Sequence, residues 1–110
     1  MKDDRVYLEH IRSAIDDIEH YTATGRDAFM NDRMQQDAVI RKLEIIGEAV
    51  KHLPEPTRQR RPEIPWRRIA GMRDRLTHDY LGVDLVLVWT AVENDLPRLR
   101  SAVEELLTQS

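Results

Sequence analysis

Residues 37–53 read DAVIRKLEIIGEAVKHL, and this stretch decides the fold class. Its apolar residues recur at three- and four-residue steps, which places them along one face of an α-helix. The residues of this stripe are Val39, Leu43, Ile46, Val50 and Leu53. Pro54 and Pro56 follow directly and end the pattern. We therefore predict a long amphipathic helix over residues 33–53 that buries its apolar face against other helices.

The same rhythm continues on both sides of this helix. An apolar stripe at Leu8, Ile11, Ile15 and Ile18 predicts a helix over residues 4–21, which Thr24-Gly25 interrupts, and residues 27–30 look like a short helical turn. Pro65 suits the start of a third helix over residues 66–77, and Asp84 suits the N-cap of a last helix. The expected buried stripe of that helix is Leu85, Val88, Val92, Leu96, Leu99, Val103 and Leu106.

Two residues disturb the predicted helices. Gly71 lowers helix propensity, so we expect it to mark a close approach to a neighbouring helix. Pro97 removes a backbone donor, which predicts a kink near residues 94–96. No alternating strand pattern, repeat or linker interrupts the chain. We predict an all-α protein, an antiparallel four-to-five-helix bundle that forms one domain over residues 1–110.

The composition excludes several classes of function. The chain has 110 residues, of which 41% are hydrophobic and 34% charged, as in a globular domain. Without cysteine it has no disulfide framework, no thiolate zinc site and no cysteine nucleophile. No apolar run approaches the roughly 18–20 residues that cross a bilayer, and the charged N-terminal sequence is unlike a secretory signal. We expect a cytoplasmic protein without a membrane partner.

The net charge of −3 conceals a local excess of arginine. Residues 58–75 hold seven arginines and only two acidic residues, a net charge of +5 in an otherwise acidic chain. The arginines allow two interpretations, as solvated helix faces or as a surface that attracts phosphate. All seven cations are Arg, which suits bidentate contacts with phosphate.

Residues 72–80, MRDRLTHDY, hold the side chains that RNA cleavage requires. A base must take the proton of a ribose 2′-OH, and cations must stabilise the charge that develops on phosphorus. Arg73 and His78 supply these groups, but on a straight helix they lie about 140° apart around the axis. They can face one phosphate only if the helix ends or distorts between them. Two copies related by a two-fold axis would bring together two of each.

These residues match the pattern of a known family. The spacing of Arg73, His78 and Tyr80 resembles that of the HEPN ribonucleases, specifically the HepT toxins of bacterial and archaeal toxin–antitoxin pairs. The likeness includes DAVIR at 37–41, LEIIGEA at 43–49, PEIPW at 62–66, IAGMRD at 69–74, and also Val83-Asp84, Trp89 and Leu96-Pro97. It covers roughly residues 3–107, with no departure at the motif positions.

The resemblance implies a homodimeric, metal-independent endoribonuclease with its site in the cleft between subunits, and no cofactor of its own. Its substrate would be cellular RNA, such as tRNA or mRNA. Arg73 would hold and neutralise phosphate, His78 would be the acid–base residue, and Asp74 would position one of them. The neighbouring arginines are candidate RNA-binding residues: Arg67, Arg68 and Arg75.

The resemblance also implies a partner, a small MntA-type nucleotidyltransferase antitoxin, as in type VII-like toxin–antitoxin systems. This enzyme would transfer AMP from ATP to Tyr80. The added phosphodiester and base would occupy the phosphate subsite near His78. The alternative function is a non-catalytic subunit that binds nucleotide or the partner in a two-part nucleotidyltransferase. The presence of Arg73, His78 and Tyr80 together favours the enzyme.

The remaining candidate ligands have structural explanations. Glu44 and Glu48 lie one turn apart but lack the Glu-x-x-His partner of a carboxylate metal site, so we expect them to pair with arginines. Trp66 and Trp89 fall at core positions and are expected to pack. Three histidines have no constellation around them and are expected at the surface: His10, His20 and His52.

Overall fold

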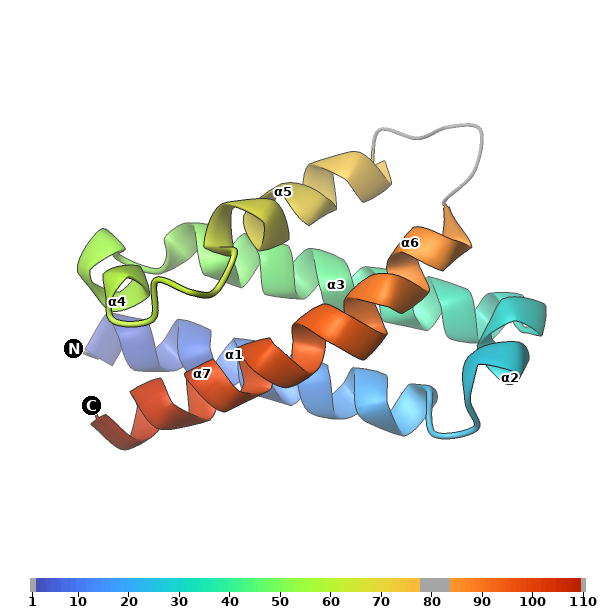
Figure 1. Cartoon of the computed structure of the whole chain (residues 1–110), viewed down its shortest axis with the longest axis horizontal. Helices are drawn as coiled ribbons and strands as arrows, with labels where there is room; N and C mark the ends of the chain where they lie inside the picture. Colours follow the sequence, from blue (N-terminus) through green and yellow to red (C-terminus); the bar gives the residue numbers. More distant parts are fainter. Residues whose placement is uncertain (1, 78–83, 110) are drawn as a thin grey trace.

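The computed structural model describes residues 2–77 and 84–109, which form α-helices joined by short connections (Figure 1). In chain order these are α1 (Lys2–Tyr21), α2 (Arg26–Asn31), α3 (Arg33–His52), α4 (Glu55–Gln59), α5 (Trp66–Thr77), α6 (Leu85–Thr90), a π-helical turn η1 (Ala91–Asp95) and α7 (Leu96–Gln109). The described residues include no strand, so the predicted all-α bundle is confirmed. Among them, no helix is both long and apolar enough to span a membrane.

The core lies where three long helices meet. α1 packs against α3 and α7, and α3 also packs against α5. The stripes predicted for α1 and α3 are almost wholly buried, with side chains 0–2% exposed. The stripe predicted for the last helix is buried from Leu96 onward, whereas Leu85 and Val92 are only partly buried. Each fully buried aliphatic side chain stabilises the fold by roughly 1.5–3 kcal/mol, so these stripes hold the bundle together.

The helix boundaries follow from local signals in the sequence. Gly25, between α1 and α2, adopts a φ of 98°, a backbone conformation that residues with a Cβ rarely adopt. Asp32 caps α3, since its carboxylate accepts hydrogen bonds from the backbone N–H groups of Met34 and Gln35. The predicted cap at Asp84 is confirmed, because its carboxylate accepts from the N–H of Leu87 at 3.1 Å.

The short helix α4 was not predicted, since Pro54 and Pro56 indicated only the end of the preceding helix. Proline is tolerated in a first turn, and α4 is anchored by tertiary contacts. The hydroxyl of Thr57 donates to the carboxylate of Asp4 on α1, and both side chains are buried. The indole N–H of Trp66 donates to the carbonyl oxygens of Arg58 and Arg61 at 3.0 and 2.9 Å. These contacts fix the start of α5 against the bundle.

The two disturbing residues behave differently. The close approach expected at Gly71 is wrong, because a Cβ built there would meet nothing within 4 Å. Near Pro97 the regular helix is interrupted by the π-helical turn η1, which overlaps the residues where we predicted a kink. Pro97 has no N–H to donate to the carbonyl of Glu93, and a wider turn accommodates this loss.

Candidate functional site

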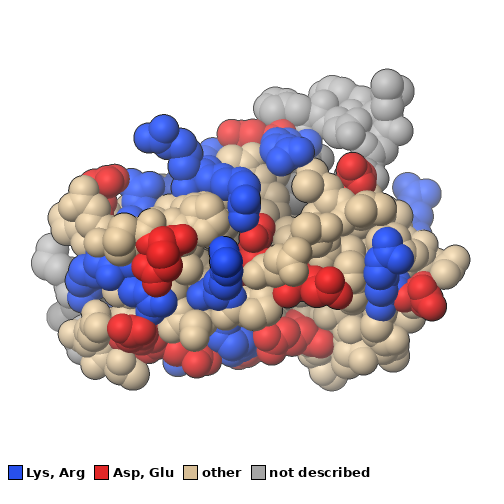
Figure 2. Space-filling view, in the orientation of Figure 1, with Lys and Arg blue, Asp and Glu red and all other residues tan. Residues whose placement is uncertain are grey.

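The helix α5 presents arginine side chains on its outer face. Trp66 and Ile69 are 7% and 2% exposed and anchor the inner face in the core. Arg67, Arg68 and Arg75 lie on other sides of the helix because of the helical period, and all three are exposed. Figure 2 shows Lys and Arg side chains gathered over α5. The described part of the predicted basic segment therefore forms a surface of exposed arginine side chains on α5.

Some arginines of this segment are occupied by structural ion pairs. Arg58 lies 2.7 Å from Glu55, and Arg61 lies 2.6 Å from both Glu63 and Glu105. The carboxylate of Glu63 accepts hydrogen bonds from its own backbone N–H and from Arg61, and these lower its pKa below the ordinary value. For these two arginines the structural interpretation of the charge is the correct one.

The three candidate RNA-binding arginines differ in their partners. Arg68 donates to the carboxylate of Asp95 in η1 at 2.7 Å. In the part of the chain that the structure describes, no ion pair engages Arg67 or Arg75. Two exposed guanidinium groups on α5 are thus available to an anionic ligand, and a third could exchange Asp95 for phosphate.

The predicted catalytic residues are only partly described. Arg73 belongs to α5, but its side chain lies outside the described residues, as do the whole of His78 and Tyr80. Asp74 is exposed, with its carboxylate 3.6 Å from Nζ of Lys51 on α3. The roles of Arg73, Asp74, His78 and Tyr80 therefore stay predictions.

A groove that was not predicted lies between α5 and the α6–η1 segment. Its volume is about 390 Å³. Apolar and polar side chains from both elements line it: Arg68, Met72, Arg75, Leu87, Val88, Thr90, Ala91, Asn94 and Asp95. The one signal in the sequence was Pro97, which indicated an irregular helix but not the element that would face it. The groove places polar groups of η1 opposite the arginines of α5.

The three histidines without a predicted role lie at the surface, as expected. His10, His20 and His52 are exposed. His52 nevertheless stacks on Tyr7, with ring centroids 5.1 Å apart, and lies 3.4 Å from Glu48. Within residues 2–77 and 84–109, no group of three His, Asp or Glu side chains is placed to hold a metal ion.

The tryptophans pack as predicted. Trp66 is buried, and Trp89 is partly buried with its ring centroid 5.3 Å from that of Phe29. The indole N–H of Trp89 donates to Glu93 at 3.2 Å. Both rings are therefore engaged with the protein itself.

Comparison with known proteins identifies the family. The Ribonuclease HepT-like family matches residues 11–106. The chain belongs to this HepT-like family. The HepT-like chain is similar to the "Probable ribonuclease HepT" of Thermococcus cleftensis, with 48% identity over 101 residues, which cover 91% of this chain and 92% of that protein. The resemblance inferred from the motif is confirmed.

Two further relatives carry ribonuclease names. A "Putative RNase" of Caldanaerobacter subterraneus subsp. tengcongensis is 42% identical over 108 residues, 97% of the HepT-like chain and 96% of the relative. A "Gamma-glutamylcyclotransferase and putative RNase" of Methanocaldococcus jannaschii is 44% identical over 109 residues, 98% of this chain. The chain spans about half of that relative, 49% of its length. No solved structure matches the chain.

Proposed function

We propose that this chain is the endoribonuclease toxin of a type VII-like HepT/MntA pair. The observation that carries the proposal is the arginine-bearing outer face of α5, which leads directly into the segment that holds His78 and Tyr80. Membership of the HepT-like ribonuclease family supports the same activity. The substrate would be cellular RNA, tRNA or mRNA.

The proposed reaction needs only groups that this chain carries. His78 of one subunit takes the proton of a ribose 2′-OH, and the oxygen attacks the adjacent phosphorus. The bond to the 5′-oxygen breaks, and that oxygen receives a proton from the second His78. Arg73 of each subunit neutralises the phosphate oxygens in the transition state. The products are a 2′,3′-cyclic phosphate end and a 5′-OH end, and no metal ion takes part.

The reaction requires two subunits, because one chain supplies a single His78 and a single Arg73. A two-fold axis near the 78–83 segment would bring both pairs together. Val86 supports a contact here, since this residue of α6 is close in sequence to the segment and is 56% exposed. We expect sedimentation velocity to report a homodimer that the change Val86→Glu weakens.

Control of the toxin would act on the same segment. A cognate nucleotidyltransferase would use ATP, and the Tyr80 hydroxyl would attack its α-phosphorus while pyrophosphate leaves. The adenylyl group would place a negative phosphodiester beside the arginines that RNA needs. Mass spectrometry after incubation with the partner and ATP should find one or more AMP additions on Tyr80. An adduct on another residue would contradict this assignment.

The test of the activity is expression without the partner. Wild-type chain should arrest growth and leave RNA fragments with cyclic phosphate ends. Arg73→Ala and His78→Ala should relieve the arrest. Arg98→Ala and His20→Ala are the matched controls, because both residues are exposed and lie outside the proposed site. Purified wild type should retain cleavage in EDTA if the reaction is metal-independent.

The rival function predicts a different result. A subunit that only binds nucleotide or partner in a two-part nucleotidyltransferase would be harmless when expressed alone. Growth without arrest, together with intact RNA after incubation with purified chain, would favour that function over the ribonuclease.

A further inference from the structure

The groove between α5 and the α6–η1 segment has an apolar floor and a polar rim. Val88 and Ala91 are buried beneath it, at 2% and 6% exposure, while Met72 is partly buried and Leu87 is 37% exposed. The rim carries guanidinium groups on the α5 side, and hydroxyl, amide and carboxylate groups on the other. The groove thus offers an aliphatic surface bordered by hydrogen-bond donors and acceptors.

The π-helical turn shapes the polar side of this rim. It places Asn94 and Asp95 in the lining, one turn beyond Thr90. Asp95 is held by Arg68 at 2.7 Å, and its side chain is only 15% exposed. Thr90 donates its hydroxyl to the carbonyl of Val86 at 2.8 Å. Within the described residues no hydrogen bond engages the Asn94 amide, which keeps a donor and an acceptor for a ligand.

The rim charges favour an anionic occupant. Arg75 is exposed and forms no ion pair among the described residues, and Arg68 has a single carboxylate partner. A nucleotide combines the features that this surface complements, namely a flat ring with polar edges and a phosphate. An aliphatic floor accepts the face of a base, an amide reads its edge, and a guanidinium binds the phosphate.

The groove also adjoins the proposed cleavage site along the chain. Met72 and Arg75 stand one and two residues from Arg73 on the same helix. At 1.5 Å of helical rise per residue, both positions lie within about 3 Å of Arg73 along the axis of α5, so a strand bound at Arg73 can pass round the helix and place a neighbouring base in the groove. π-Helical turns are frequent at functional sites, which agrees with a role for η1 in binding.

We propose that this groove binds one nucleobase of the RNA strand next to the cleaved phosphodiester, with Asn94 reading the base edge. The proposal rests on the ribonuclease function and adds to it a site of base selection. Arg75 binds the backbone phosphate of that nucleotide and contributes affinity without selectivity.

The test measures binding rather than cleavage, so it does not depend on activity. The His78→Ala chain is titrated by fluorescence anisotropy with labelled hexauridylates in which each position in turn carries A, C or G. One position should prefer one base by at least about fivefold in Kd, as an amide contact with a base edge provides. Adding Asn94→Ala should abolish that preference, and Asn31→Ala, an exposed asparagine on α2, should preserve it.

A second variant separates phosphate contact from base reading. Adding Arg75→Ala should weaken all hexamers by a similar factor and lower the salt dependence of Kd by about one phosphate contact. Binding without preference at any position, or a preference that survives Asn94→Ala, overturns the inference. Sedimentation velocity checks the rival occupant. If Leu87→Ser splits the dimer and the chain shows no base preference that depends on Asn94, the groove is covered by a second copy and the inference fails.

Cleavage by the wild type then distinguishes the two proposals. Cleaved RNA with no base preference in these titrations refutes the groove assignment and leaves the ribonuclease standing. Uncleaved RNA with an Asn94-dependent preference refutes the ribonuclease function and supports the groove as a nucleotide site.

Discussion

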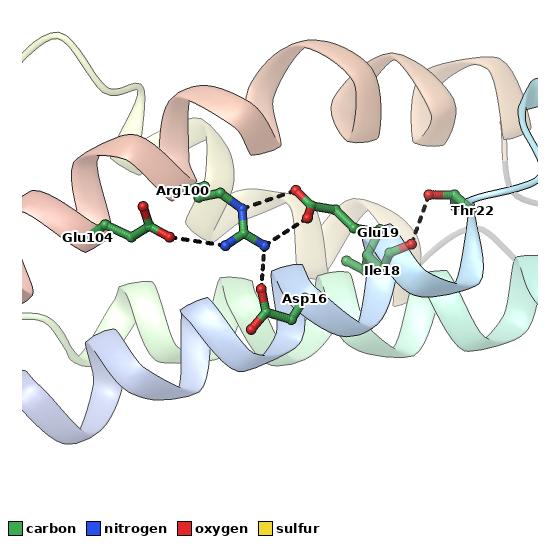
Figure 3. Close-up of polar contacts among 6 residues, drawn as sticks. All are labelled: Asp16, Ile18, Glu19, Thr22, Arg100 and Glu104. Atoms are coloured by element: carbon green, nitrogen blue, oxygen red, sulfur yellow. Dashed lines mark hydrogen bonds and ion pairs between the residues drawn. The ribbon is translucent and has the colours of Figure 1, made fainter.

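Arg100 joins the first and last helices of the bundle through charge (Figure 3). Its guanidinium donates to both carboxylate oxygens of Glu19 on α1, at 3.0 and 2.9 Å, and also to Asp16 on the same helix. Glu104, one turn along α7, accepts a further bond at 3.1 Å. The hydrogen bonds that Arg100 donates, to Asp16 first and then to Glu19 and Glu104, raise the pKa of Arg100 above its ordinary value. We predict that Arg100→Ala weakens the contact between α7 and α1 and thereby lowers the free energy of unfolding.

The expected magnitude follows from exposure. The Arg100 side chain is 23% exposed, whereas its three carboxylate partners are 51–58% exposed. An exposed ion pair contributes roughly 0.2–1 kcal/mol, and the two-oxygen contact with Glu19 belongs near the upper end. Two partners across helices and one within the helix give a loss of about 1–2 kcal/mol for Arg100→Ala. For a chain of this size each kcal/mol lowers the unfolding midpoint by roughly 4–8 °C, so the midpoint would fall by about 4–16 °C.

Thermal unfolding followed by circular dichroism measures this loss. Arg98→Ala is the matched control, because Arg98 is exposed on the same helix and has no ion pair within the described residues. Its effect should stay within about 0.5 kcal/mol. In 1 M salt, where the Debye length is about 3 Å, the difference between the two variants should shrink. Equal stability at low salt, or a difference that salt leaves unchanged, would refute the charge-based reasoning.

Three further predictions concern stability. Gly25→Ala should lower the free energy of unfolding by about 1–3 kcal/mol, because φ at this position is 98°. Gly71→Ala should raise it by about 0.5–1 kcal/mol, because the new Cβ would lie in open space within α5. Urea titration compares the two variants. Asp32→Ala should cost about 1 kcal/mol in the same assay through the lost cap, and an unchanged midpoint would contradict this. Glu63 has a lowered pKa, so its contribution is complete above pH 4.5 and is lost as the pH falls below that value; Glu63→Gln should flatten the acid side of the stability curve.

The long helices could be predicted because their signal is local. Apolar residues such as Leu43 and Ile46 repeat with the helical period, and burial of that face is the largest favourable contribution to folding. The same holds for the Asp84 cap, whose partner N–H lies three residues away. Features that depend on neighbours along the chain were therefore accessible from the sequence.

Features that depend on distant residues were not accessible. α4 is anchored by the hydrogen bond from Thr57 to Asp4, which lies fifty-three residues earlier in the chain. No local sequence pattern predicts this contact. The prediction at Gly71 failed for the same reason, since the space around a helical glycine is set by the helices that face it. The groove likewise requires α5 and η1 to be opposed, and Pro97 alone indicates only one of the two walls.

The net charge of the basic segment, counted from the sequence, overstates the number of arginines that are available to a ligand. Residues 58–75 carry a net charge of +5, yet Arg61 is bound to Glu105 and Arg68 to Asp95, both distant in sequence. Ion pairing thus neutralises Arg58, Arg61 and Arg68, and the arginines of this segment without an ion pair among the described residues are Arg60, Arg67 and Arg75. If RNA binds here, the salt dependence of binding should correspond to few phosphate contacts, about two or three per subunit, and not to the seven arginines of the segment.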